Sequence, residues 1–76
     1  MAEEFTLAPM RRLIKKCGDL RVSEEASEEL RRVIGDYGYR IAGAAVALAR
    51  QERRRTVLAR DIRAAQRQIE AAVEDR

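Results

Sequence analysis

The sequence predicts an all-α fold in which a short helix, a loop, a long helix, a second loop and a third helix follow one another. Three observations support this prediction. Apolar residues recur at helical spacing over residues 9–17, 23–51 and 56–73. Proline is absent after Pro9, and the segments between the apolar stripes are short and polar. The middle stripe corresponds to roughly 28 residues and 42 Å of helix, which two short neighbouring helices cannot cover.

The first helix has recognisable signals at both ends. Thr6 is expected to be its N-cap, and Pro9 suits a first helical turn. Its apolar stripe consists of Met10, Leu13, Ile14 and Cys17. Gly18 is expected to end the helix as a C′ glycine. Cys17 is expected to be a small buried apolar residue, because the chain has no His with which a thiol nucleophile could pair.

The long second helix is expected to begin after Ser23, whose side chain can cap it. Acidic residues follow in the first turn, where negative charge suits the helix dipole. The apolar stripe consists of Ala26, Leu30, Val33, Ile34, Tyr37, Ile41, Ala44, Ala45 and Leu48. Gly35 and Gly38 lie near the midpoint. They are either tolerated in a strong helix or mark a close approach between two crossing helices.

The second loop is expected at residues 52–55, with Thr56 as the N-cap of the third helix. The stripe of that helix consists of Leu58, Ile62, Ala65, Ile69, Ala72 and Val73. Asp61 is close enough in sequence to fold back on Arg54. This pair is either an ordinary surface ion pair or a contact that holds the loop in shape.

The chain is long enough for one domain, which we place at residues 6–73 between frayed ends at 1–5 and 74–76. Its hydrophobic content is 46%, but 13 of those residues are Ala. A chain this short with such small side chains buries little apolar area by itself. It has a single Cys and no disulfide pair or zinc ligand spacing that could compensate. Association with a second chain is therefore expected.

The net charge of +3 understates the basic character of the chain, because both ends are acidic. Residues 9–67 contain 15 basic and 8 acidic residues, and 14 of the 16 basic residues in the chain are Arg. Basic residues cluster at 11–16 and 53–55, on either side of the long helix. This clustering favours a polyanionic partner over a merely solvated surface.

The candidate contacts with that partner fall in two places. In the first helix they are Arg11, Arg12, Lys15 and Lys16. In the second loop they are Arg53, Arg55 and Thr56, which precede a helix N-terminus, where exposed N–H groups favour anions. No enzymatic activity is expected, because the chain has no His, no Gly-rich phosphate loop and no Ser with a recognisable base. No cofactor, metal site or small-molecule substrate is expected. No apolar run approaches the ~18 residues of a membrane span, so no membrane partner is expected.

Several short motifs occur in an order and spacing that resemble one family. They are Leu7-Ala8-Pro9, Arg21-Val22-Ser23, Ile41-Ala42, Leu48-Ala49-Arg50 and the run from Arg54 through Thr56-Val57 to Asp61-Ile62. The last is the most specific. Together they resemble the histone-fold family, and the archaeal-type minimal histones most closely. The resemblance covers roughly residues 7–67.

The resemblance implies a histone fold that forms an intertwined handshake homodimer and wraps and compacts double-stranded DNA. Contacts would be largely sequence-independent, through phosphates and the minor groove. Arg12 resembles a groove-inserting Arg. Arg21, Arg55 and Thr56 resemble the contacts of the paired loops. Arg54 and Asp61 resemble a pair that shapes the second loop. A cytoplasmic location on the chromosome, in the nucleoid, would follow.

The same resemblance places a dimer–dimer junction at Leu48, Gln51, Asp61 and Ala64. Gln51 replaces a His that is common there, and Ala64 is smaller than the usual Leu. We therefore expect dimers in free solution and larger assemblies only on DNA. Arg11 occupies a position that often holds a small residue, which implies a stronger or differently angled contact.

Two other functions remain open from the sequence. The first is a histone-fold subunit of a transcription or repair complex that acts mainly through protein–protein contacts. The second is a small helical oligomer that binds RNA or an acidic protein. The retained Arg21, Arg55 and Thr56 favour the DNA-binding interpretation, because such subunits often lose these loop residues.

Overall fold

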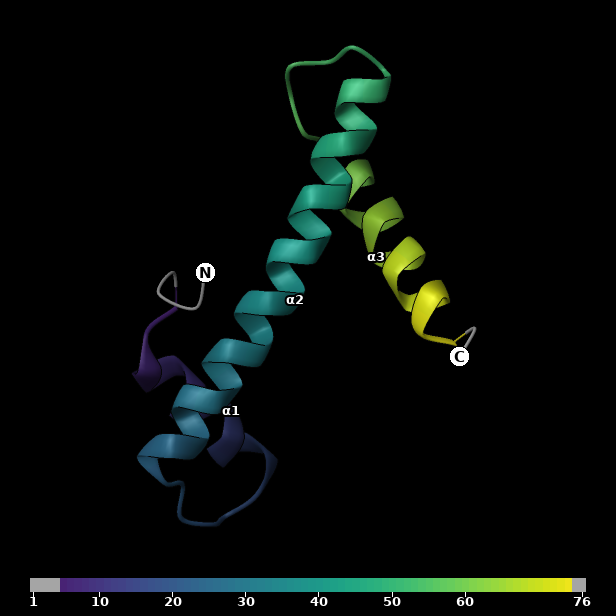
Figure 1. Ribbon diagram of the computed structural model, residues 1–76. Coiled ribbons are helices and arrows are strands. Elements are labelled where there is room, and N and C mark those ends of the chain that lie inside the picture. Colours follow the sequence, from purple (N-terminus) through teal and green to yellow (C-terminus); the bar gives the residue numbers. More distant parts are fainter. Residues whose placement is uncertain (1–4, 75–76) are drawn as a thin grey trace. The chain divides into compact units, whose positions relative to one another are not determined.

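The computed structural model describes the backbone of residues 5–74 and the side chains of residues 5–72. Three helices lie within this range (Figure 1): α1 spans Leu7–Cys17, α2 spans Glu24–Gln51 and α3 spans Ala59–Glu74. This is the predicted all-α order of helices. Fraying was expected at residues 1–5 and 74–76. Of these, residues 1–4 and 75–76 lie outside the described residues, and Glu74 is the last residue of α3. No described helix is both long enough and apolar enough to cross a bilayer.

The chain divides into two compact units, Met1–Tyr37 and Gly38–Arg76, and α2 runs through both. In the first unit, α1 crosses the N-terminal part of α2 (Figure 1), and residues of both helices line one hollow. Met10 is the buried side chain of α1, and Ser27 is buried on α2. The Ser27 hydroxyl and the Arg31 Nε have no hydrogen-bond partner among the described residues. The contact between α1 and α2 is therefore small and partly polar.

The second unit joins the C-terminal part of α2 to α3 through alanines. Ala45, Ala49 and Ala65 are at most 3% exposed. Because these side chains are small, the two helices can pack closely but remove little apolar area from water. This unit therefore depends on polar contacts in the loop between its helices, which are described below.

Both units leave large apolar side chains partly exposed. They are Leu13, Leu20, Val33, Tyr37, Tyr39, Val57, Leu58 and Ile62. Most of them, including Val33, Tyr37 and Ile62, belong to the apolar stripes that the sequence predicts. A single chain therefore buries only part of each stripe, and the remainder is available for another surface.

The helix termini confirm one expectation and correct another. The Ser23 hydroxyl accepts a hydrogen bond from the N–H of Ala26 at 3.0 Å, so Ser23 caps α2 as predicted. Gly18 follows the last residue of α1, as expected, but its backbone is extended, with φ −177° and ψ 155°. It is therefore not a left-handed C′ glycine, and the turn after α1 does not require glycine at this position.

The prediction that Cys17 is buried is wrong, because its side chain is exposed. The thiol contacts the carbonyl oxygen of Leu13 at 3.6 Å, within its own helix. Leu13 itself is 46% exposed. The stripe of α1 is therefore covered at Met10 and left open toward its C-terminal end. Helical spacing identified the apolar face but not how much of that face α2 covers.

Candidate nucleic-acid interface

The basic residues of α1 form the first candidate surface. Arg11, Arg12, Lys15 and Lys16 are all exposed and line a shallow hollow on the helix. Lys15 and Lys16 occupy the last turn, where positive charge suits the helix dipole. Arg11 and Arg12 also line a second hollow with Leu7, Ala8, Glu24 and Ser27. The helix thus presents four cations to solvent over two turns.

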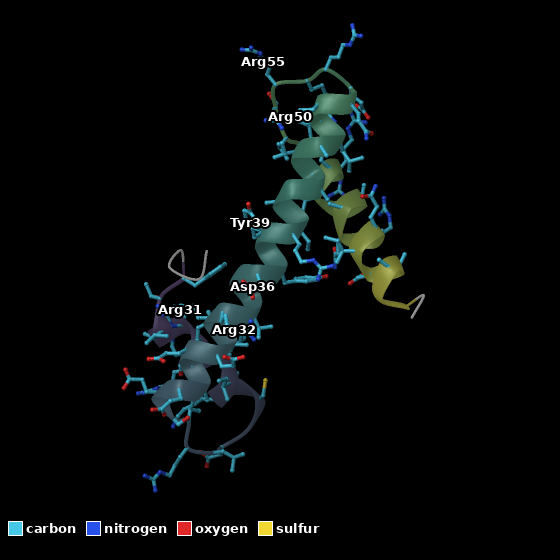
Figure 2. All side chains as sticks on the ribbon, in the orientation of Figure 1. Arg31, Arg32, Asp36, Tyr39, Arg50 and Arg55 are labelled. Atoms are coloured by element: carbon cyan, nitrogen blue, oxygen red, sulfur yellow. The ribbon has the colours of Figure 1, made fainter. Side chains whose placement is uncertain are left out.

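The basic residues of α2 provide a useful contrast. Arg32 donates to the exposed carboxylates of Glu29 and Asp36 on the same helix. Figure 2 labels Arg32 and Asp36 on α2. The hydrogen bond from Arg32 is the main cause of a lowered pKa at Glu29. A guanidinium held by two carboxylates is a poor candidate for phosphate binding. Arg32 therefore serves as an internal reference for a basic residue that does not belong to the interface.

Loop 1, residues 18–23, carries Arg21. Arg21 is exposed and lies two residues before the Ser23 cap. Within the loop, the N–H of Leu20 donates to the carbonyl of Gly18 at 3.0 Å. Leu20 is 75% exposed. Loop 1 is thus held by local backbone and cap contacts, and it leaves the Arg21 side chain at the surface.

Loop 2, residues 52–58, begins with a distinctive end to α2. The N–H of Arg53 donates to the carbonyl of Arg50, and the N–H of Arg54 donates to that of Ala49, both at 2.9 Å. This is the pair of hydrogen bonds of a Schellman motif. Its C′ residue is Arg53, with φ 58°. Glycine is usual there, because a side chain in the left-handed region is disfavoured.

Arg54 connects the two ends of loop 2. Its Nη1 and Nη2 donate to the two carboxylate oxygens of Asp61 at 2.9 and 2.7 Å. Nη1 also donates to the carbonyl of Thr56, and Nε donates to Glu52, both at 2.9 Å. The side chains of Arg54 and Asp61 are 20% and 5% exposed. This bidentate pair therefore differs from an ordinary surface ion pair.

Asp61 has two functions in the loop. Besides binding Arg54, its Oδ2 accepts the N–H of Leu58 at 2.7 Å, which satisfies a backbone donor just before α3. The hydrogen bond from Arg54, followed by that from Leu58, lowers the pKa of Asp61 from 3.8 to about 2. Hydrogen bonding to Asp61 likewise raises the pKa of Arg54. Both groups are therefore charged at neutral pH.

The prediction that Thr56 caps the third helix is wrong. α3 begins at Ala59, three residues later, and the carboxylate of Asp61 accepts the N–H of Leu58, the residue just before the helix. Thr56 instead contributes its backbone carbonyl to Arg54. The sequence pattern suggested Thr as the cap because Thr is a common N-cap residue. An Asp in the first turn can accept the same orphan N–H groups from inside the helix.

With Arg54 engaged, the other predicted contacts of loop 2 remain at the surface. Arg53, Arg55 and Thr56 are exposed. Figure 2 shows Arg55 projecting outward from the loop, above Arg50. Arg50 was not among the residues predicted from sequence. It joins Arg55 in a hollow whose lining is Val46, Ala49, Arg50, Arg54, Arg55 and Val57. Its place in the last turn of α2, next to the basic loop, was the available signal.

The four residues predicted for a dimer–dimer junction differ in how exposed their side chains are. Gln51 is exposed, Leu48 and Ala64 are half-buried, and Asp61 is 4% exposed. Both oxygens of Asp61 are already used by Arg54 and Leu58. Little of this carboxylate remains for a second dimer. All four residues belong to the second unit of the chain.

Comparison with known proteins identifies the family. Residues 3–65 match the family described as histone-like transcription factor (CBF/NF-Y) and archaeal histone. The chain belongs to this family. A subunit of the archaeal histone HAN1 from Thermococcus zilligii is 40% identical over 62 residues, covering 82% of this chain and 92% of that protein. The probable archaeal histone 3 of Methanocaldococcus jannaschii is 38% identical over 64 residues, covering 84% and 96%.

Membership confirms the predicted resemblance and the histone fold. It also supports a DNA-binding, architectural role for the chain. The matched segment includes α1, both loops and the first turns of α3. The remainder of α3, after residue 65, extends beyond the family match.

Proposed function

We propose that this histone-fold protein binds and compacts double-stranded DNA as a homodimer, through largely sequence-independent contacts with phosphates and the minor groove. The main support for the proposal is that the Arg side chains of loop 2 have different environments. Arg54 is held internally by Asp61, Glu52 and Thr56. Its neighbours Arg53 and Arg55 remain exposed and free for phosphate. A histone-fold chain with such a loop is suited to bind a polyanion.

The dimer follows from the exposed apolar stripes. Val33 and Tyr37 on α2 and Ile62 on α3 are between 39% and 47% exposed in the single chain. Crossing two long helices in a handshake would bury these side chains and supply the core that the alanine-rich contacts lack. Residues 6–73 would then act as one histone-fold domain. A handshake would also bring loop 1 of one chain beside loop 2 of the other.

The DNA surface would consist of the paired loops and the first helices of the two chains. The paired loops would contribute Arg21, Arg53, Arg55 and Thr56, and the first helix would contribute Arg11, Arg12, Lys15 and Lys16. Arg12 would enter the minor groove, while planar guanidinium groups would bind phosphates bidentately. Because phosphate contacts dominate, affinity should depend weakly on sequence and strongly on salt. The protein would then be associated with the chromosome in the nucleoid and would perform no catalysis.

The test is binding to a mixed-sequence duplex, measured by mobility shift at several salt concentrations. If a dimer neutralises about 6 phosphates, the slope of log K against log salt should be near −5. The Arg12→Ala, Arg55→Ala double variant should bind at least ~10-fold more weakly. Arg32→Ala is the matched control, because Arg32 is already engaged by Glu29 and Asp36. Equal affinity of the double variant and the control would refute the proposed surface.

Assembly beyond the dimer is proposed to need DNA. Gln51 offers a neutral amide at the junction, and Asp61 is occupied within its own chain. We therefore expect dimers in free solution and larger assemblies where DNA brings dimers side by side. Sedimentation at tens of micromolar protein, with and without DNA, tests this. A stable tetramer without DNA would contradict the assignment of Leu48, Gln51, Asp61 and Ala64 to a weak junction.

A second function is worth testing because the family also includes histone-like transcription factors. In that case the chain would be a subunit of a transcription or repair complex and would need an unlike partner. The purified chain alone distinguishes the two functions. A homodimer that protects DNA from nuclease in regular lengths supports the architectural role. A chain that stays unfolded or fails to bind DNA until a second histone-fold protein is added supports the alternative.

A further inference from the structure

Arg60, in the first turn of α3, has no role in the interface described so far. Its Nη2 donates to the Oε1 of Glu52 at 3.1 Å, across loop 2. A cation close to a helix N-terminus is not favoured by the helix dipole, so Arg60 does not stabilise α3 through its position. The side chains of Arg60 and Glu52 are 59% and 52% exposed. The pair is thus accessible to solvent and to ligands.

Glu52 is shared by two guanidinium groups. The same Oε1 accepts the Nε of Arg54 at 2.9 Å and the Nη2 of Arg60. Arg54 does not depend on it, because Asp61 and the Thr56 carbonyl already bind its other nitrogens. Glu52 is also the only carboxylate in residues 50–60, a segment that contains five Arg. It therefore reduces the positive charge of the loop where the charge is most concentrated.

We propose that Arg60 is a further phosphate-binding residue and that Glu52 holds it back until DNA arrives. A phosphate of the DNA backbone then replaces the Glu52 carboxylate on Arg60. This inference rests on the proposed function and adds a residue and a competitor to the same surface. It places Arg60 next to Arg54, because both guanidinium groups donate to the same oxygen of Glu52.

The energetics of the pair favour such an exchange. An ion pair between two exposed side chains contributes little to stability, so breaking it costs little. A phosphate offers Arg a charge-assisted, bidentate acceptor in the same place. The displaced carboxylate would remain near the phosphate and repel it. Glu52 should therefore weaken DNA binding, and this effect should require Arg60.

The experiment is a double-mutant cycle with Glu52→Gln, Arg60→Gln and the double variant. Glu70→Gln is the control, since it makes the same change in net charge on an exposed part of α3, where Glu70 accepts only Gln66 at 3.3 Å among the described residues. Affinity for a mixed-sequence duplex is measured across a salt series. Thermal unfolding checks that each variant remains folded, as expected because Arg54 keeps its contacts with Asp61 and Thr56.

Glu52→Gln should bind DNA about threefold to fivefold more tightly than Glu70→Gln does. Adding Arg60→Gln should remove that gain, and each phosphate interaction that disappears with Arg60 should reduce the salt slope by about 1. A gain that survives the loss of Arg60, or one no larger than that of the control, would overturn the inference. So would a salt slope that is unchanged by Arg60→Gln. Failure of the unmodified protein to bind duplex DNA would instead contradict the proposed function itself.

Discussion

The C-terminal ends of α1 and α2 differ in backbone conformation and in the residue that follows the helix. Each helix is followed by a loop that contains Arg, which is Arg21 in loop 1 and Arg53 to Arg55 in loop 2. α1 is followed by Gly18, yet Gly18 is extended and uses none of its special freedom. α2 is followed by a Schellman motif whose C′ position is left-handed, yet that position is Arg53. Glycine thus occupies the loop that does not require it, and Arg occupies the position where glycine is preferred.

The two loops also differ in how they are held. Loop 1 contains a Ser23 cap and one short backbone hydrogen bond. Loop 2 contains four hydrogen bonds from the guanidinium of Arg54. The strained backbone at Arg53 is adjacent to this network, which can hold it in place. A loop can therefore present Arg side chains either by local capping or by using one Arg to fix the positions of the others.

The largest effect is expected from removing the carboxylate of Asp61. Asp61→Ala leaves the partly buried Arg54 and the N–H of Leu58 without their acceptor, so loop 2 and the start of α3 should both loosen. The melting temperature should fall by on the order of 10 °C. Asp36→Ala, which removes an exposed carboxylate from Arg32, is the control and should cost far less. Similar melting temperatures for both variants would show that loop 2 is no better anchored than the surface of α2.

Acid should weaken loop 2 in a defined pH range. The pKa of Asp61 is lowered from 3.8 to about 2 in the folded chain, mainly by the hydrogen bond from Arg54. A lowered pKa means that the stabilising contribution is complete above about pH 4 and is lost as the pH falls toward 2. The unfolding midpoints of the unmodified protein and Asp61→Asn should therefore converge over this range. Subtracting the two curves removes the titration of other carboxylates. A constant difference down to about pH 2 would contradict the assignment.

Arg53→Gly sharpens the comparison of the two helix ends. Glycine adopts the φ of 58° without steric cost, so the variant should be more stable by about 1 kcal/mol. It should also bind DNA more weakly, because an exposed cation is lost. Arg53→Ala is the matched control, because it loses the same charge and keeps the strained backbone. We expect equal affinities for the two variants, measured by mobility shift, and higher stability for glycine only. Equal stabilities would show that Arg53 carries no strain in solution.

The smallest effect is expected at Gly18. Its extended backbone suits any residue, and a Cβ placed there has no neighbour within 4 Å. Gly18→Ala should therefore stabilise the protein by about 0.5 kcal/mol, because alanine reduces the entropy of the unfolded chain. Chemical denaturation is sensitive enough to detect this change. A loss of stability would indicate that Gly18 adopts a left-handed conformation after all.

Local features of the sequence were enough to determine the helices. Periodic apolar residues identified all three, and the Ser23 cap and the ends of α1 and α2 were correctly placed. The contact between Arg54 and Asp61 was also predictable, because only a short loop and the first turn of α3 separate the two residues. The family motifs lie in the same local segments. These features depend on neighbours in sequence, and therefore sequence reasoning could find them.

Tertiary structure decided what each of these residues does. Asp61, rather than Thr56, accepts the backbone N–H just before α3. Cys17 is exposed, and Arg53 lies in the left-handed region. It also brought Glu52 to both Arg54 and Arg60, which no periodic pattern indicates. The physical reason is that these outcomes depend on how loop 2 closes and how α1 and α3 pack. Several donors compete there for few acceptors, and only the geometry in space selects among them.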